Sequence, residues 1–133
     1  WVERIAMVET QGVDSVVEFM LDRWFTVDFR VRQPSIVRRV RDMILNTSAI
    51  GYVASCHAIV SSSLGSQIEN ITVPTLVATG ENDPATPVAV ARGIHEQITD
   101  SRLVLIEDAA HLANVEQPEK FAKLVLEFFR TLQ

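Results

Sequence analysis

Two short apolar runs in the second half of the chain, with a helical segment between them, restrict the fold more than any other feature of the sequence. Residues 75–78 (Thr-Leu-Val-Ala) and residues 103–106 (Leu-Val-Leu-Ile) have the length and apolar character of strands that are buried on both faces. Between them, Thr86 and Pro87 would cap and begin a helix that reaches about Ile98. A strand, a helix and a second strand in this order predict parallel strands with a right-handed crossover.

An amphipathic helix closes the chain. From Pro118 onward, apolar residues follow the i, i+3, i+4, i+7, i+11 spacing of one helix face: Phe121, Leu124, Val125, Phe128 and Leu132. The order strand, helix, strand, helix predicts the α/β fold class. A sheet of two parallel strands would expose unpaired backbone groups at both edges, so we expect these strands to be a portion of a larger sheet.

The first half of the chain has a different pattern. Residues 1–64 show helical periodicity and almost no strand signal. A helix is predicted from about Gly12 to Trp24, and a short polar stretch then runs to Gln33. Pro34 suits the first position of the next helix, and Thr47 or Ser48 could cap a further one. The change of pattern near residue 70 divides a helical part from an α/β part.

Composition limits the classes of function. The 133 residues, 47% of them hydrophobic, suffice for one compact core. The net charge of −5, from 17 acidic and 12 basic side chains, argues against a nucleic-acid partner. The single cysteine, Cys56, excludes an internal disulfide and indicates a reducing compartment. With no apolar run near the roughly 20 residues of a membrane span and no signal peptide, we expect a cytoplasmic protein without a membrane partner.

The candidate chemistry lies directly after the two predicted strands. Asp83 belongs to the segment that follows the first strand, and His111 to the segment that follows the second. Open α/β sheets bind ligands beyond the carboxyl ends of their strands, so the carboxylate and the imidazole are expected to lie close together. Asp83 would then accept the Nδ1–H of His111, which fixes the tautomer and stabilises the imidazolium. Asp83 could instead be a turn aspartate, and Asp108 and Glu81 compete for the acid role.

Two motifs carry a resemblance to a known family. The segment G-x-x-D-x-x-x-P at 80–87 and the segment A-H-x-x-x-x-E-Q-P at 110–118 resemble the final third of the α/β-hydrolase superfamily, whose triads end with acid and then histidine. Within it, the similarity to 3-oxoadipate enol-lactonases extends upstream, to Trp24-Phe25-Thr26 and to Gly51-Tyr52 followed by Cys56. The resemblance implies a helical cap (lid) region at 1–68 and, at 69–133, the C-terminal part of the hydrolase core.

The resemblance also implies an activity. Enol-lactonases of this kind open a lactone to 3-oxoadipate in the β-ketoadipate pathway of aromatic catabolism. A serine would attack the lactone carbonyl, His111 would take its proton, and Asp83 would orient His111. Water activated by the same histidine would release the acyl group. No cofactor and no metal are implied, and the partner would be a small-molecule lactone or ester.

The chain departs from that family in one respect. The nucleophile motif G-x-S-x-G is absent, and Ser61, Ser62, Ser63 and Ser66 follow a predicted helix rather than a strand. We therefore expect a fragment that is inactive alone and that pairs with itself or with an N-terminal half. Two alternatives stay open: another α/β-hydrolase (an esterase, a C–C hydrolase or a cofactor-free haloperoxidase), and a non-catalytic assembly or binding module.

Several further side chains have two interpretations. Trp24 would be either cap core or a wall of the substrate site, and His57 would line the roof of the pocket. Cys56 and His57 do not form a thiol dyad, because neighbouring residues of a helix point about 100° apart. The arginines of the helical part form a solvated face, and one of them could bind a substrate carboxylate: Arg30, Arg32, Arg38, Arg39 and Arg41. His95 is expected at the surface.

Overall fold

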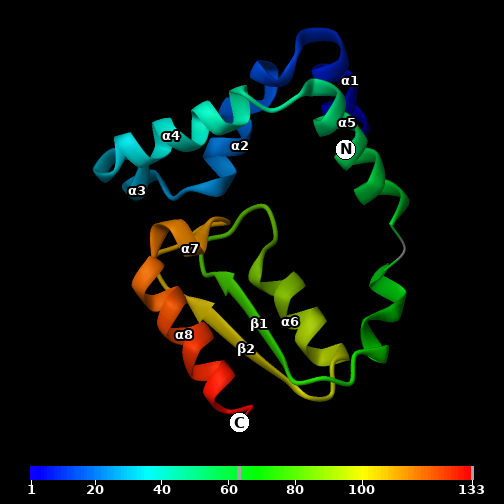
Figure 1. Cartoon of the computed structure of the whole chain (residues 1–133), viewed down its shortest axis with the longest axis vertical. Helices are drawn as coiled ribbons and strands as arrows, with labels where there is room; N and C mark the ends of the chain where they lie inside the picture. The colour runs from blue at the N-terminus through cyan, green and yellow to red at the C-terminus, as the bar shows by residue number, and fades with distance from the viewer. Residues whose placement is uncertain (63, 133) are drawn as a thin grey trace. The chain divides into compact units, whose positions relative to one another are not determined.

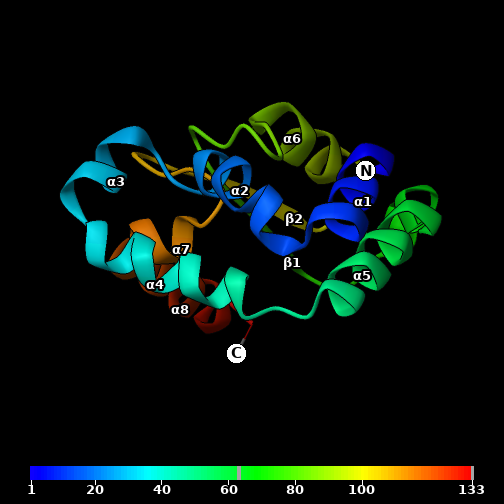
Figure 2. The same cartoon turned by 90° about the horizontal axis from the view of Figure 1, so that it is seen from above.

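The computed structural model describes residues 1–62 and 64–132 (Figure 1, Figure 2). The predicted order of helices followed by strand, helix, strand and helix is confirmed, and the two strands are parallel. Within the described residues, no single helix is long and apolar enough to cross a membrane, although one bent pair of helices, 34–45 with 49–61, meets the criteria of length and composition jointly.

The chain divides into two compact units. The first unit contains residues 1–22 and 27–63, and the second contains Arg23–Thr26 together with residues 64–133. The short segment Arg23–Thr26 thus belongs with the strands although helical residues of the first unit precede and follow it. Residues 64–68, which the motif-based division assigns to the cap, also belong to the second unit.

The first unit consists of helices. These are α1 (Val2–Gln11), the 3₁₀ helix η1 (Val13–Val16), α2 (Val17–Trp24, whose last two residues belong to the second unit), α3 (Val27–Arg32), α4 (Pro34–Leu45) and α5 (Ala49–Ser61). Helices α1 and α5 lie side by side (Figure 1, Figure 2). As predicted, Pro34 begins α4, and the Ser48 side chain caps α5 by accepting a hydrogen bond from the Gly51 N–H at 3.4 Å.

Two helices of this unit lie in the region predicted to be helical but were not given bounds from the sequence. Helix α3 occupies the stretch predicted as polar, and Phe29 is its single buried side chain. Helix α1 buries only Ile5 and Val8 among mostly polar or exposed neighbours. Helix α3 has only six residues, fewer than two full turns, so a 3.6-residue period cannot be recognised in it.

The second unit contains the sheet. Strands β1 (Thr75–Gly80) and β2 (Ser101–Ile106) pair in parallel, with Thr75 opposite Ser101 and Gly80 opposite Ile106. Helix α6 (Val88–Gln97) joins the strands, α7 (Ala113–Glu116) and α8 (Pro118–Arg130) follow them, and the 3₁₀ helix η2 (Leu64–Asn70) precedes them. Each strand is two residues longer than its apolar run, because polar residues and a glycine also join the hydrogen-bonded ladder.

Helices α6 and α8 cover opposite faces of the strand pair (Figure 1, Figure 2). On the α8 face, a core forms around Ile106, Ala109, Ala113 and Leu124, with the half-buried Leu76, Val104 and Phe121 against it. The strands are less buried than predicted: only Thr79, Gly80 and Ile106 are buried. The expectation of burial on both faces is thus met only at the carboxyl ends of the strands, where the polar loops begin.

Candidate active site

The loops that follow β1 and β2 are joined to each other by backbone hydrogen bonds. The N–H of Glu81 donates to the carbonyl of Ile106, and that of Asn82 donates to the carbonyl of Ala109, both at 2.9 Å. Gly80 makes this approach possible: a Cβ at this position would lie 2.2 Å from the Ala110 carbonyl oxygen and 2.4 Å from that of Ala109. The absence of a side chain at Gly80 therefore allows the two loops to meet.

Asp83 is held firmly in the first loop. Its side chain is only 3% exposed. Oδ1 accepts hydrogen bonds from the N–H groups of Ala85 at 2.7 Å and Thr86 at 3.0 Å, and Oδ2 accepts one from the Thr86 hydroxyl at 2.6 Å. The Arg23 guanidinium donates to the carbonyl of Pro84 at 2.7 Å and so ties this loop to the Arg23–Thr26 segment. Asp83 thus stabilises the turn that contains it, and its carboxylate is held in a fixed position.

The surroundings of Asp83 favour its ionised form. Burial raises the pKa of this carboxyl, but hydrogen bonds from the Thr86 hydroxyl, the Thr86 N–H, His111 and the Ala85 N–H together lower the pKa below its ordinary value of 3.8. Asp83 is therefore a carboxylate at neutral pH, and it presents acceptors only.

His111 lies against this carboxylate. Its Nδ1 is 2.9 Å from Oδ2 of Asp83 and 3.4 Å from the Thr86 hydroxyl. Because a carboxylate cannot donate, Nδ1 carries the hydrogen of the bond to Asp83, and Nε2 is the basic nitrogen of the neutral ring. The imidazole is 35% exposed. Together with Asn114 and Phe121, the pair lines a pocket of about 160 Å³.

The residues on both sides of His111 are also held by backbone hydrogen bonds. The N–H of Ala110 donates to Oε2 of Glu116, a buried carboxylate whose Oε1 accepts from the N–H and the hydroxyl of Thr26 at 2.8 and 2.7 Å. The N–H of Leu112 donates to the carbonyl of Trp24 at 3.0 Å. Sequence reasoning missed this role of Glu116; its only signal was the glutamate of the E-Q-P motif.

The structure brings together three of the four site residues predicted from the sequence. Asp83, His111 and Trp24 belong to the second unit, where Trp24 is half-buried and bound through its backbone. His57 belongs to the first unit, exposed on α5, where it lines a pocket of about 430 Å³ with Glu9 and the apolar side chains Val8, Ala49, Ile50, Val53 and Ala54. The two competing acids, Asp108 and Glu81, are exposed.

His95 differs from its expected surface position. It is half-buried, and its Nδ1 lies 2.7 Å from the hydroxyl of Ser101, which itself donates toward the carbonyls of His95 and Ile98. The imidazole thus connects the end of α6 to the start of β2. Its role is structural, because it joins the helix and the strand at the opposite end of β2 from His111.

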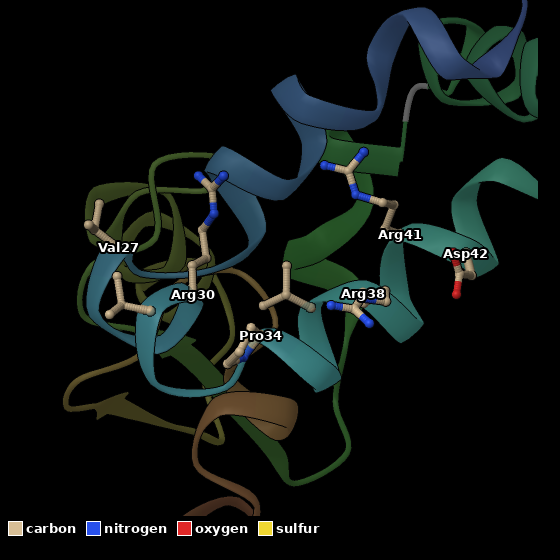
Figure 3. A pocket seen from close by; sticks show the side chains of 8 residues that line it. Val27, Arg30, Pro34, Arg38, Arg41 and Asp42 are labelled. Atoms are coloured by element: carbon tan, nitrogen blue, oxygen red, sulfur yellow. The ribbon is translucent and has the colours of Figure 1, made fainter.

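An arginine-lined pocket of about 750 Å³ lies within the first unit, between α3 and α4 (Figure 3). Its walls combine apolar side chains with three arginines and the carboxylate of Asp42. Arg30 pairs with Asp22 and Glu18, and Arg41 pairs with Glu18. Arg38 forms no ion pair with the residues that the structure describes. Two of the three arginines that line the pocket are thus paired with carboxylates, and Arg38 is the third.

The side chains that could bind a metal ion are dispersed. Across residues 1–62 and 64–132, no three His, Cys, Asp or Glu side chains are grouped so that they could hold such an ion.

A buried aspartate and a histidine follow the carboxyl ends of adjacent parallel strands, which is the arrangement that the acid and the base have in α/β-hydrolase triads. The chain belongs to the α/β-hydrolase superfamily: the family described as TAP-like protein matches residues 43–133. The resemblance seen in the motifs is thereby confirmed at the level of the superfamily.

Relatives of known identity agree with this assignment. The chain is 36% identical over 121 residues to 3-oxoadipate enol-lactonase 2 of Acinetobacter baylyi, an alignment that covers 91% of the chain and 45% of that protein. It is 29% identical to 3-oxoadipate enol-lactonase 1 of the same organism, covering 100% of the chain and 50% of the relative. The chain thus spans about half the length of the curated relatives it matches.

Solved structures show the same relationship. An enol-lactonase from Burkholderia xenovorans LB400 superposes with a TM-score of 0.94 at 34% identity, covering 98% of this chain and 50% of that one. A hydrolase from Pseudomonas aeruginosa PA01 superposes with a TM-score of 0.90, also at 34% identity, covering 97% and 49% of the two chains. The observed architecture therefore corresponds to a C-terminal portion of the α/β-hydrolase fold.

Proposed function

We propose that this chain supplies the acid and the base of a serine-type hydrolase that opens lactones or esters, with an enol-lactone of the 3-oxoadipate type as its substrate. The observation that carries the proposal is the 2.9 Å contact between His111 Nδ1 and the buried carboxylate of Asp83. The similarity to two enol-lactonases supports the choice of a lactone over other esters.

In this proposal His111 acts as the general base. A serine hydroxyl from a G-x-S-x-G segment outside these 133 residues attacks the carbonyl carbon, and Nε2 of His111 takes its proton. The carbon–oxygen bond of the lactone then breaks, and the imidazolium returns the proton to the leaving enolate oxygen. In the second half, His111 deprotonates water, which releases the carboxylic acid and restores the serine. Asp83 stabilises the imidazolium in both halves.

We also propose a role for the remaining predicted residues. Trp24 would form a wall of the substrate site, which is supported by the bond between its carbonyl and the N–H of Leu112, next to His111. His57 would contact substrate from the cap region, supported by the apolar pocket that it lines. Arg38 is the arginine best suited to a substrate carboxylate. Residues 1–68 would then act as the cap and residues 69–133 as part of the core.

The proposal is tested on the product of the full reading frame that contains this chain. That frame should encode a G-x-S-x-G segment upstream, and its product should hydrolyse an enol-lactone faster than a p-nitrophenyl ester. Asp83→Asn should lower kcat by roughly 10³-fold or more. Asp108→Asn is the matched control, because Asp108 has a φ of 55°, a conformation that asparagine tolerates.

Other outcomes would identify the alternatives. Faster turnover of the simple ester would indicate an esterase rather than a lactonase. A frame without a nucleophile motif, whose product hydrolyses neither substrate, would contradict the proposal and favour an assembly or binding module.

A further inference from the structure

Glu116 is a carboxylate in an unusual position, 7% exposed and without a cationic partner among the ion pairs of the described residues. Burying such a charge is costly unless hydrogen bonds compensate for it. Three donors do so: the N–H of Ala110, the N–H of Thr26 and the hydroxyl of Thr26. Each of these is a charge-assisted bond and therefore stronger than a bond between neutral groups.

The donors come from two segments that are far apart in the sequence. Ala110 is six residues from Glu116, and Thr26 is 90 residues from it. The segment that contains Thr26 makes a second contact with the same loop, because the carbonyl of Trp24 accepts the N–H of Leu112. The residues immediately before and after His111 are therefore held by Glu116 and by the segment that Glu116 binds.

This arrangement bears directly on His111. Its side chain is 35% exposed, so packing alone restrains the ring weakly, and Nδ1 lies closer to Asp83, at 2.9 Å, than to the Thr86 hydroxyl, at 3.4 Å. A catalytic side chain must be held within about 0.5 Å of its productive position, which requires a fixed backbone beneath it. Asp83 restrains the ring, and the hydrogen bonds of Glu116 and Trp24 restrain the backbone.

We propose that Glu116 is a positioning residue for His111, acting through the Ala110 peptide group and coupling the Trp24–Thr26 segment to the base of the proposed triad. The inference rests on the proposed function of His111 but is testable without turnover. Glutamine cannot replace Glu116, because an amide that keeps its oxygen toward Thr26 turns its NH₂ toward the N–H of Ala110 and places two donors together.

The test uses the 133-residue chain labelled with ¹⁵N, in which His57, His95 and His111 are the only histidines. The ring nitrogen resonances of His111, assigned by their loss in His111→Ala, report its bond to Asp83, and Asp83→Asn provides the reference for a broken bond. Glu116→Gln should move these resonances toward those of Asp83→Asn and should accelerate exchange of the Ala110 amide hydrogen about tenfold or more. The exposed Glu119 gives the matched control, Glu119→Gln, which should change neither quantity.

A second variant covers the case in which Glu116→Gln does not fold. Thr26→Val removes one hydroxyl donor and keeps the N–H, so it should shift the His111 resonances in the same direction by a smaller amount. If either folded variant loses stability but leaves the His111 ring resonances where they are, Glu116 is merely structural and the inference is overturned. That result would leave the proposed function intact, since the latter is decided by turnover in Asp83→Asn and Asp108→Asn.

Discussion

Oδ2 of Asp83 lies 2.9 Å from Nδ1 of His111, although 28 positions separate the two residues in the chain. The contact arises because β1 and β2 are parallel and in register, so that the loops after them leave the same edge of the sheet. Three of the hydrogen bonds to the Asp83 carboxylate come from Ala85 and Thr86. The position of the carboxylate therefore does not depend on His111 alone.

The stability of the fold should depend on the ionisation of Asp83. Because the pKa of Asp83 is lowered in the folded state, its carboxylate stabilises the fold above the ordinary value of 3.8, and this stabilisation is lost as pH falls through the lower, folded-state pKa. Asp83→Asn should cost about 1–3 kcal/mol at pH 7 and should flatten the decline of the unfolding free energy below about pH 4. Urea unfolding between about pH 2.5 and pH 7 measures both effects.

The exposed Asp100 offers a control for that measurement. Asp100→Asn should leave the pH dependence of the unfolding free energy unchanged. An equally steep acid decline in Asp83→Asn and in the unsubstituted chain would show that Asp83 does not carry this stabilisation.

Gly80 should not tolerate a side chain. In Gly80→Ala the new Cβ would meet the carbonyl oxygens of Ala109 and Ala110 at 2.4 and 2.2 Å, and the loop that carries His111 would have to move. We expect a loss of about 1–3 kcal/mol in unfolding free energy, the usual cost of overpacking. Gly93→Ala is the matched control, since nothing lies within 4 Å of the position that its Cβ would occupy on α6, and it should stabilise by about 0.5–1 kcal/mol. Equal effects of the two substitutions would contradict the close approach of the loops.

Asp83 and His111 should act as one unit in the product of the full reading frame. Each alanine substitution should lower kcat by roughly 10³-fold or more, and the double variant should be little worse than either single one, because triad members are strongly non-additive. Steady-state kinetics on the four proteins of this cycle supply the comparison. If the loss of kcat in the double variant equals the product of the two single losses, one of the two residues has another role.

The 133-residue chain by itself should hydrolyse no lactone and no ester. It contains no G-x-S-x-G segment, so His111 has no activated nucleophile to serve other than water. Turnover of an enol-lactone and of a p-nitrophenyl ester should equal the rate in buffer. A rate well above buffer that disappears in His111→Ala would refute this expectation.

The same chain should associate in solution. Within the described residues β1 and β2 form a two-stranded sheet, so each strand has an unpaired outer edge. Large apolar side chains are also exposed, among them Ile50 at 83% and Phe129 at 57%. Such edges and side chains promote association, either with a second copy or with a complementary N-terminal fragment of the hydrolase. Sedimentation at micromolar concentration should detect oligomers, whereas a sharp monomer boundary would count against the prediction.

The sequence by itself determined the local features of this protein. The apolar runs of β1 and β2 are short and uninterrupted, and the face of α8 repeats regularly over 13 residues, so period and length identify them. The order of these elements implies parallel strands, and parallel strands imply that Asp83 and His111 follow the same sheet edge. Each step depends only on residues that are near one another in the chain.

Only the tertiary structure decided how that edge is held together. The burial of Glu116 depends on Thr26, 90 residues away, and no local pattern relates the two. The need for glycine at position 80 likewise comes from the Ala109 and Ala110 carbonyls on the neighbouring loop. The assignment of Arg23–Thr26 to the second unit has the same origin. Hydrogen bonds and steric limits between distant segments depend on the packed arrangement, which periodicity and spacing do not encode.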